Sequence, residues 1–163
     1  MVISWFSAGV SSALCTKLMI HEIDKIIYIH INDQQPDTLR FVKDCEDWFG
    51  KKIDIVQSIY KDVNTVILEK GYINYGGRGA VCSRFLKRQV RLDYEKDKKD
   101  LTYVWGIDAR EEKRQYGIVD AMPNQKHIFP LIDQGITKNK AHQMLRTKIK
   151  RPQMYDLGYS NNN

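Results

Sequence analysis

The opening of the chain constrains the fold more than any other stretch, because an apolar strand there runs through a turn of small residues directly into a helix. Residues 2–6 read VISWF and residues 7–12 read SAGVSS. Small side chains let an anion approach the backbone N–H groups at the start of a helix. The serine hydroxyls could bind the same anion or cap the helix. Residues 7–12 are therefore either a phosphate cradle or an ordinary capped turn.

The alternation of strands and helices continues through the first seventy residues. Residues 26–31 form an almost unbroken apolar, β-branched run, which is typical of a parallel strand covered on both faces. A helix with an apolar face follows, which Asp37 or Thr38 could cap and Gly50 ends. Residues 53–57 predict a strand and residues 63–70 a helix ended by Gly71. This order predicts an α/β fold with a mostly parallel sheet and right-handed crossovers.

The second half of the chain continues this pattern. Residues 72–81 are a glycine-rich loop that contains Arg78 and could close over a nucleotide, or have no role. Residues 82–91 predict a basic helix, and residues 102–105 a strand that is followed by Gly106 and a densely charged segment. That segment could hold binding residues, or it could be a helix start with Glu–Lys and Glu–Arg pairs on its surface. Thr137 is placed to cap a helix through Arg146, and residues from about 150 to 163 predict an irregular tail.

Length and composition favour one domain, residues 1–163, and exclude several classes of protein. No apolar run reaches the ~18 residues that a membrane span needs, and no signal peptide is evident, so we expect a cytoplasmic protein without membrane contact. The 3 cysteines are widely spaced and the 4 histidines form no metal-binding pair, so we expect no disulfide framework and no metal site. An iron–sulfur cluster needs about four thiolates, more than this chain has.

The net charge of +6 favours a polyanionic partner, either a nucleotide or a nucleic acid. Much of the positive charge lies late in the chain, where it could equally be a solvated face. The residues are Lys138, Lys140, Arg146, Lys148, Lys150 and Arg151.

Taken in order, several segments resemble the phosphoadenosine phosphosulfate reductase family, particularly its short, phage- and prophage-type members. Residues 7–12 are similar to the S-G-G-x-D-S loop of PP-loop ATP pyrophosphatases and of these reductases, with Ala8 in place of a glycine and Ser11 in place of the acid. Residues 29–38 resemble the family's second strand and the turn that borders the adenosine. Residues 82–87 resemble its C-x-x-x-x-K segment, residues 106–114 its G-x-R-x-x-E segment, and residues 130–133 with 154–159 its P-L-x-D-W segment and tyrosine- and glycine-bearing tail.

The resemblance implies a three-layer α/β/α fold of the PP-loop, adenine nucleotide alpha-hydrolase-like type, and a set of residues that would bind a nucleotide. The opening loop would hold phosphate or sulfate, Asn32 and Asp33 would lie beside ribose or adenine, and cations would neutralise phosphate charge. Glu111 would orient them or contact a metal. The complete set is Ser7, Ala8, Gly9, Val10, Ser11, Ser12, Asn32, Asp33, Arg78, Lys87, Gly106, Arg110, Glu111 and Arg114.

Three functions fit these residues. The first is an adenine-nucleotide-binding protein of the reductase-like family, for a sulfonucleotide or ATP. Reductases of this family attack sulfur with a cysteine that follows the Gly-Tyr tail. This chain stops at Asn163, so we expect either a chain cut short or a member without the thiol step, and no catalytic residue is assigned. A thioredoxin-like reductant would be a partner only if a cysteine segment follows.

The second function is adenylation of a nucleic acid or small substrate by ATP, with Mg²⁺ accompanying the triphosphate and pyrophosphate released. The loss of the loop's acid at Ser11 argues against this ATP cleavage. The third is a non-catalytic module that binds a nucleotide or DNA. In none of the three do we expect a covalently bound cofactor, and a homo-oligomer is left open.

Overall fold

The computed structural model describes residues 1–73 and 80–162 of the chain, and their contacts divide it into two compact units. Unit 1 comprises residues 1–28, residues 35–54 and the described residues from 100 onward. Unit 2 comprises residues 29–34 and the described residues between 55 and 99. The opening loop that was expected to hold a phosphate and the tail from about residue 150 both belong to unit 1.

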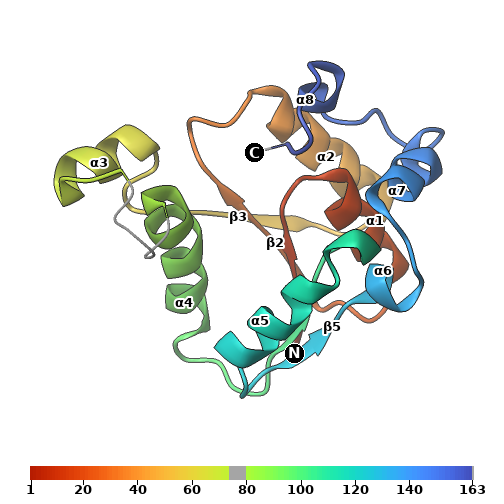
Figure 1. The fold of residues 1–163 in the computed structure, drawn as a ribbon, viewed down its shortest axis with the longest axis horizontal. Coiled ribbons are helices and arrows are strands. Elements are labelled where there is room, and N and C mark those ends of the chain that lie inside the picture. Colours follow the sequence, from red (N-terminus) through yellow and green to blue (C-terminus); the bar gives the residue numbers. More distant parts are fainter. Residues whose placement is uncertain (74–79, 163) are drawn as a thin grey trace. The chain divides into compact units, whose positions relative to one another are not determined.

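The described strands form a five-stranded sheet in the order β3-β2-β1-β4-β5 (Figure 1). β1 pairs in parallel with both β2 and β4, and β4 pairs in parallel with β5. The strand order reverses at β1, which is the signature of a doubly wound α/β fold. The predicted fold class is confirmed. The strands are β1 (Val2–Phe6), β2 (Lys25–His30), β3 (Ile53–Gln57), β4 (Thr102–Val104) and β5 (Lys126–Ile128).

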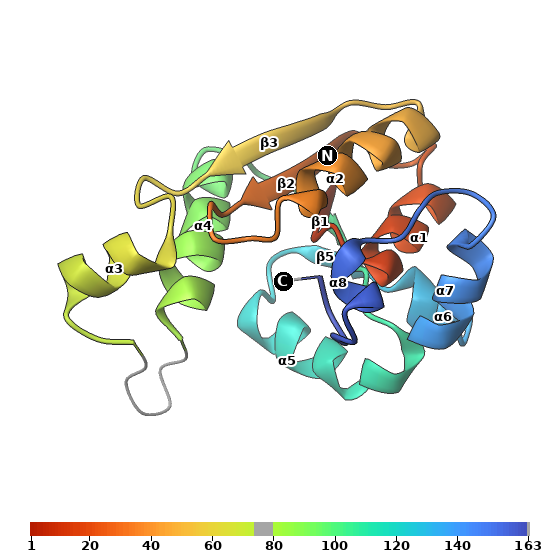
Figure 2. The same cartoon turned by 90° about the horizontal axis from the view of Figure 1, so that it is seen from above.

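The helices of unit 1 follow the strands in the expected order (Figure 2). α1 packs against β1, α6 and α7. The first helix ends at Leu18, where a turn begins. The helical elements are α1 (Val10–Leu18), α2 (Asp37–Phe49), the 3₁₀ turn η2 (Ala109–Glu111), α5 (Lys113–Ala121), α6 (Pro130–Asp133), α7 (Lys138–Leu145) and α8 (Gln153–Asp156).

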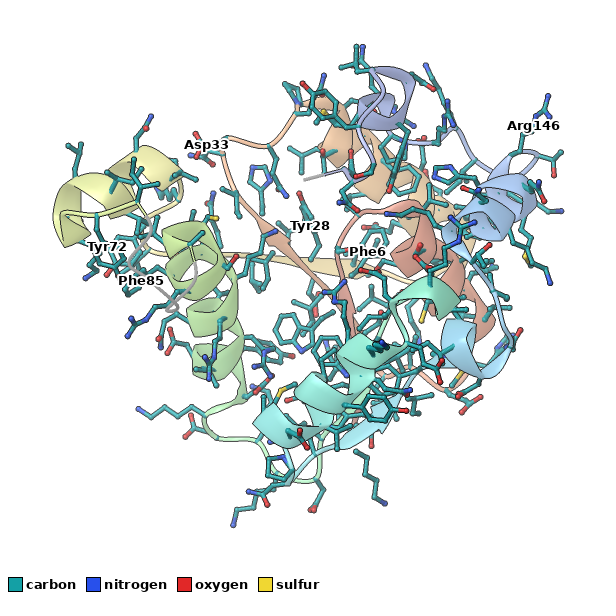
Figure 3. All side chains as sticks on the ribbon, viewed as in Figure 1. Phe6, Tyr28, Asp33, Tyr72, Phe85 and Arg146 are labelled. Carbon is teal, nitrogen blue, oxygen red and sulfur yellow. The ribbon has the colours of Figure 1, made fainter. Side chains whose placement is uncertain are left out.

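The register of the sheet explains why both faces of its central strands are apolar. Ser4 lies beside Ile26 and Val104, so Ser4 and Phe6 share one face with them. That face is buried in the main core, where the Phe6 ring lies 6.4 Å from the Tyr28 ring (Figure 3). Ile3 and its neighbour Tyr103 point to the opposite face and are also fully buried. Burial on both faces is what the unbroken apolar runs predicted.

The two ends of α2 differ in how well the sequence predicts them. Gly50 ends the helix in the left-handed conformation, with φ +67°, as expected of a C-terminal glycine. At the other end, neither Asp37 nor Thr38 caps the helix. Pro36 occupies the N-cap position, and the Asp37 N–H is bound by the Gln35 side chain instead. The Asp37 carboxylate is thereby left for contacts with the C-terminal segment.

Unit 2 contains α3 (Val63–Lys70), the π-helix η1 (Cys82–Arg88) and α4 (Gln89–Glu95). Asp62 caps α3 by accepting from the Thr65 N–H, and Gly71 ends it. The single basic helix expected over residues 82–91 is instead a π-helix that passes into α4. A small core of Ile31, Val66, Val81 and Leu86 holds the unit together.

Within residues 1–73 and 80–162, no helix has the length and apolar character needed to cross a membrane.

Substitution of Phe41 by Ala tests the main core. Phe41 is fully buried on α2 and its ring stacks 6.5 Å from Phe6, so its removal leaves a cavity that the rigid sheet cannot close. We expect Phe41→Ala to lower the free energy of unfolding by about 3–5 kcal/mol in urea denaturation. Ile59, which is 86% exposed, provides the control: Ile59→Ala should change it by less than about 0.5 kcal/mol.

Candidate functional site

The loop of residues 7–12 lies at the carboxyl end of β1, where the strand order reverses. In doubly wound sheets this reversal opens a crevice that receives ligands. Gly106, which follows β4, meets the loop there, because a Cβ on Gly106 would lie 2.5 Å from the Ser12 Cα. Only glycine fits at this contact. The structure thus brings together two of the segments that the sequence proposed for the site.

The conformation of the loop differs from that of a simple capped turn. Ala8 is fully buried and has φ +56°, the left-handed region that residues with a Cβ rarely adopt. Gly9 is the N-cap residue of α1 and is extended, and no side chain caps the helix from this position. Ser12, one of the three serines that could have capped the helix or bound an anion, accepts a hydrogen bond from the Ser7 N–H at 3.0 Å.

Polar groups at the start of α1 remain available for a ligand. The Ser11 hydroxyl is buried and has no hydrogen-bond partner among the described residues. A hydroxyl buried in this way is usually paired, so its state calls for an explanation. The first amides of a helix also have no partner within the helix, and its dipole favours an anion. The start of α1 therefore combines a positive electrostatic environment with an unpaired hydroxyl.

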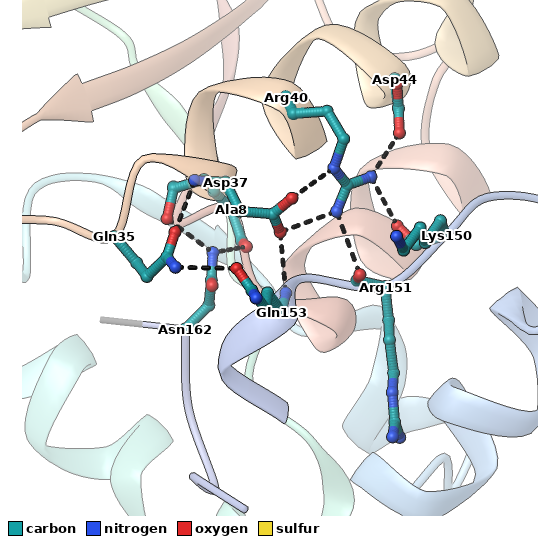
Figure 4. Close-up of polar contacts among 10 residues, drawn as sticks. Ala8, Gln35, Asp37, Arg40, Asp44, Lys150, Arg151, Gln153 and Asn162 are labelled. Carbon is teal, nitrogen blue, oxygen red and sulfur yellow. Dashed lines mark hydrogen bonds and ion pairs between the residues drawn. The ribbon is translucent and has the colours of Figure 1, made fainter. Parts of the chain in front are cut away.

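The C-terminal segment reaches this loop with two side chains. The Tyr155 hydroxyl accepts a hydrogen bond from the Val10 N–H at 3.2 Å, and burial raises the pKa of the phenol, which keeps it protonated. The His142 ring packs edge-on against Tyr155, with the ring centroids 4.6 Å apart. The Asn162 amide donates to the Ala8 carbonyl oxygen at 2.7 Å (Figure 4). The segment expected to be an irregular tail therefore includes the short helix α8 and contacts the loop.

An ion-pair network on α2 holds this segment in place (Figure 4). Arg40 binds Asp37 through two hydrogen bonds of 2.6 and 2.8 Å and donates to the carbonyl oxygens of Lys150 and Arg151. Asp37 also accepts from the Gln153 N–H at 2.7 Å. The Arg40 hydrogen bonds lower the pKa of Asp37 the most, burial opposes them, and the Gln153 N–H lowers it further.

The charged residues predicted after β4 are placed at the surface of unit 1. Arg110 is exposed, and its backbone N–H binds the carboxylate of Asp108, which caps η2 and is only 4% exposed. Glu111 and Arg114 form an ion pair with each other, one turn apart. In the described part of the chain, no hydrogen bond or ion pair joins these three residues to the loop, and their role toward a nucleotide stays a prediction.

The remaining predicted residues belong to unit 2 or lie outside the described chain. Asn32 accepts from the Gln57 side chain at 2.7 Å, and Asp33 accepts from the Val63 N–H at the start of α3 at 2.6 Å. Lys87 lies in the π-helix, a structure that often marks functional sites, and burial lowers its pKa. Arg78 lies outside the described residues. The structure gives Asn32 and Asp33 structural partners, and their nucleotide contacts stay predictions.

Unit 2 also contains a cavity of about 430 Å³ that none of the predicted site residues lines. It lies between the end of β3 and α4, and its walls are mostly apolar. We regard the loop as the stronger candidate, because it combines the start of a helix with a buried hydroxyl that has no partner among the described residues. The cavity is lined by Val56, Gln57, Ser58, Ile59, Tyr60, Phe85, Gln89, Val90, Asp93 and Tyr94.

Sequence reasoning missed the residues that contact the loop from a distance. Tyr155 and Asn162 were placed in the tail, and Thr38 was considered as a helix cap and as part of the turn that resembles the family's adenosine-bordering turn. Thr38 is 1% exposed and lies 3.4 Å from the Asn162 amide. The contacts of Asn162 with Ala8 span 154 positions, so no local spacing could have indicated them. The resemblance of residues 154–159 to a family tail was the only available signal.

Two of the three cysteines, Cys15 and Cys45, are buried in the main core. Burial raises the pKa of Cys15 to about 12, and it also raises the pKa of the buried Cys45. Both thiols are therefore protonated near neutral pH and shielded from solvent. Within the described parts of the chain, His, Cys, Asp and Glu side chains form no cluster of the kind that holds a metal ion.

Among solved structures, the chain is similar to the phosphoadenylyl-sulfate (PAPS) reductase from Candida auris in its phosphate complex. The TM-score is 0.63 at 13% sequence identity, and the similarity covers 99% of this chain and 80% of that one. The likeness establishes a shared fold. No protein-family model and no curated protein matches the sequence.

Two glycines provide a test of the contact between β4 and the loop. A Cβ on Gly106 would collide with the Ser12 backbone, so Gly106→Ala should lower the free energy of unfolding by about 1–3 kcal/mol. Gly117, inside α5, has open space around it, and Gly117→Ala should raise the free energy of unfolding by about 0.5–1 kcal/mol. Urea denaturation of both variants measures the difference. Equal effects would show that Gly106 is not held against the loop.

The pH dependence of stability tests the network that holds the C-terminal segment. Because the folded pKa of Asp37 lies below its unfolded value of about 3.9, its contribution is present at neutral pH and is lost as the pH falls below that value. We expect the wild-type protein to be more stable than Asp37→Asn by about 1 kcal/mol at pH 7. This difference should shrink on acidification, as measured by chemical denaturation from pH 7 to pH 3. A difference that is independent of pH would contradict the network.

Proposed function

We propose that the protein binds the phosphate or sulfate end of an adenine nucleotide at the loop of residues 7–12. The observation that carries this proposal is the buried Ser11 hydroxyl, which has no partner among the described residues, in the first turn of a helix whose N-cap residue, Gly9, has no side chain to cap it. An anion would accept hydrogen bonds from this hydroxyl and from amides of this turn other than that of Val10, which donates to Tyr155. The resulting charge-assisted bonds are stronger than those between neutral groups.

The fold supports the choice of ligand class. A PAPS reductase, solved as a phosphate complex, shares the fold of this chain. That enzyme's name identifies a phosphorylated adenylyl sulfate as its substrate. The position of the loop at the reversal of strand order, together with the net charge of +6, supports an anionic nucleotide as the ligand here as well.

The proposal concerns binding, because reduction of a sulfonucleotide needs a reactive thiolate. Cys15 is buried, donates to the Trp105 carbonyl oxygen and has a raised pKa, and Cys45 is equally buried. Neither can attack a bound sulfonucleotide. Cys82 is partly exposed but belongs to unit 2. A reductase activity would draw its thiol from a cysteine other than Cys15 and Cys45.

Isothermal calorimetry against four adenine nucleotides tests the ligand class. We propose to titrate AMP, ATP with Mg²⁺, adenylyl sulfate and its 3′-phosphorylated form. Preference for the two sulfonucleotides supports the reductase-like function, and release of pyrophosphate from ATP in the presence of a polynucleotide supports adenylation. Binding of none of the four would contradict the proposed function. Salt-sensitive binding of DNA alone would then indicate a nucleic-acid module.

Substitution of Ser11 by Ala separates ligand binding from folding. The hydroxyl has no partner in the folded chain, so Ser11→Ala should leave the free energy of unfolding unchanged or raise it slightly. A hydrogen bond to an anion contributes about 1.5–3 kcal/mol, so affinity should fall about 10- to 100-fold. Calorimetry measures the affinity. Thr147→Ala, which removes an exposed hydroxyl, serves as the control and should leave it unchanged.

A further inference from the structure

We propose that Asn162 is a positioning residue for the anion loop. On this proposal, which rests on the proposed function, Asn162 binds the Ala8 carbonyl and so keeps Ala8 in its left-handed conformation and the Gly9 N–H turned toward the ligand. The loop and Asn162 both belong to unit 1. The side chain at one end of the chain would then determine how well the other end binds an anion.

Ala8 has a backbone conformation that is unfavourable for alanine. Its φ of +56° brings the Cβ too close to the backbone carbonyl of the same segment, which disfavours this region for every residue except glycine. Asparagine and aspartate tolerate it better because their side chains bind the local backbone, but alanine has no such group. Ala8 therefore depends on contacts from other parts of the chain to hold this conformation.

The Asn162 side chain supplies such a contact. The Asn162 Nδ2 donates to the Ala8 carbonyl oxygen at 2.7 Å and lies 3.4 Å from the Thr38 hydroxyl (Figure 4). Asn162 is 3% exposed and Thr38 is 1% exposed, so water does not compete for these bonds. The amide is held between α2 and the loop, and it reaches the carbonyl of the residue whose backbone is strained.

The planar peptide bond between Ala8 and Gly9 links the direction of the Ala8 carbonyl to that of the Gly9 N–H. In a trans peptide, the carbonyl of one residue and the N–H of the next point in opposite directions. When Asn162 fixes the Ala8 carbonyl on its own side, the Gly9 N–H must point away from Asn162. Gly9 directly precedes α1, so this N–H adds to the donors at the helix start. Rotation of this one peptide would remove the N–H from the site and place a carbonyl oxygen there.

Other contacts of the C-terminal segment hold Asn162 beside Ala8 without involving the Asn162 side chain. The Arg40 network holds residues 150–153. Tyr155 binds the Val10 N–H, and Lys138 binds the Ser160 carbonyl and the Asn161 side chain at 2.8 and 2.7 Å. Loss of the Asn162 side chain should therefore leave the segment in place and change the loop specifically.

A double-mutant cycle tests this proposal with adenylyl sulfate as the calorimetric probe. Asn162→Ala should weaken binding about 10-fold in the wild-type background, a change that corresponds to about 1.4 kcal/mol. In the background of Ala8→Gly it should weaken binding less than about 3-fold, because glycine adopts positive φ without strain. A purely structural role of Asn162 predicts the same loss in both backgrounds, and that result would overturn the proposal. Asn139→Ala, on an exposed asparagine of α7, is the matched control and should leave binding unchanged.

A measurement without ligand keeps the proposal separate from the proposed function. The backbone chemical shifts and the HN–Hα coupling of Ala8 report its φ by NMR. We expect Ala8 to leave the left-handed region in Asn162→Ala and to stay there in Asn139→Ala. An unchanged Ala8 in Asn162→Ala would refute the positioning role even if nucleotides bind. Failure of the wild-type protein to bind any nucleotide, with Ala8 shifted as expected, would instead refute only the proposed function.

Discussion

The reversal of strand order at β1 is the constraint on which the rest of unit 1 depends. Because β2 and β4 both pair with β1 in parallel, the chain leaves the same edge of the sheet after β1 and after β4. The loop of residues 7–12 and Gly106 are thereby in close contact, and α1 starts at this point with the positive end of its dipole. The topology alone therefore places a positively polarised helix start at the reversal of strand order, before any particular side chain is considered.

The C-terminal segment adds specific side-chain contacts to this helix start. Asp37 and Arg40 on α2 hold the segment in position. The Asp37 carboxylate is available for this contact because Pro36 is the N-cap residue of α2 and the Gln35 side chain binds the Asp37 N–H. Tyr155 and Asn162 then contact the loop from opposite ends of the segment. The ion pair is partly exposed and contributes modestly to stability, so its main effect is to position the segment.

Much of the fold was predictable from sequence, and less of the site was. Periodicity, β-branched runs and terminal glycines located the strands and most helices, since these signals arise within a few residues. The loop, too, was recognisable from its small residues. The contacts of Asn32 and Asp33 were not, because each side chain has a partner that is distant in sequence. The Glu111–Arg114 ion pair is local, and surface pairs of this kind were one of the two alternatives for that segment. The π-helix over residues 82–88 was likewise read as an ordinary helix.

The sequence by itself determined that the chain is α/β, that a turn of small residues follows its first strand, and that helices end at Gly50 and Gly71. These features follow from local sterics and hydrophobic spacing, which act over one or two turns of chain. Only the tertiary structure decided that Ala8 adopts a left-handed conformation and that Asn162 holds its carbonyl. The reason is that a strained backbone is stabilised by contacts between segments far apart in sequence, and no local pattern encodes them.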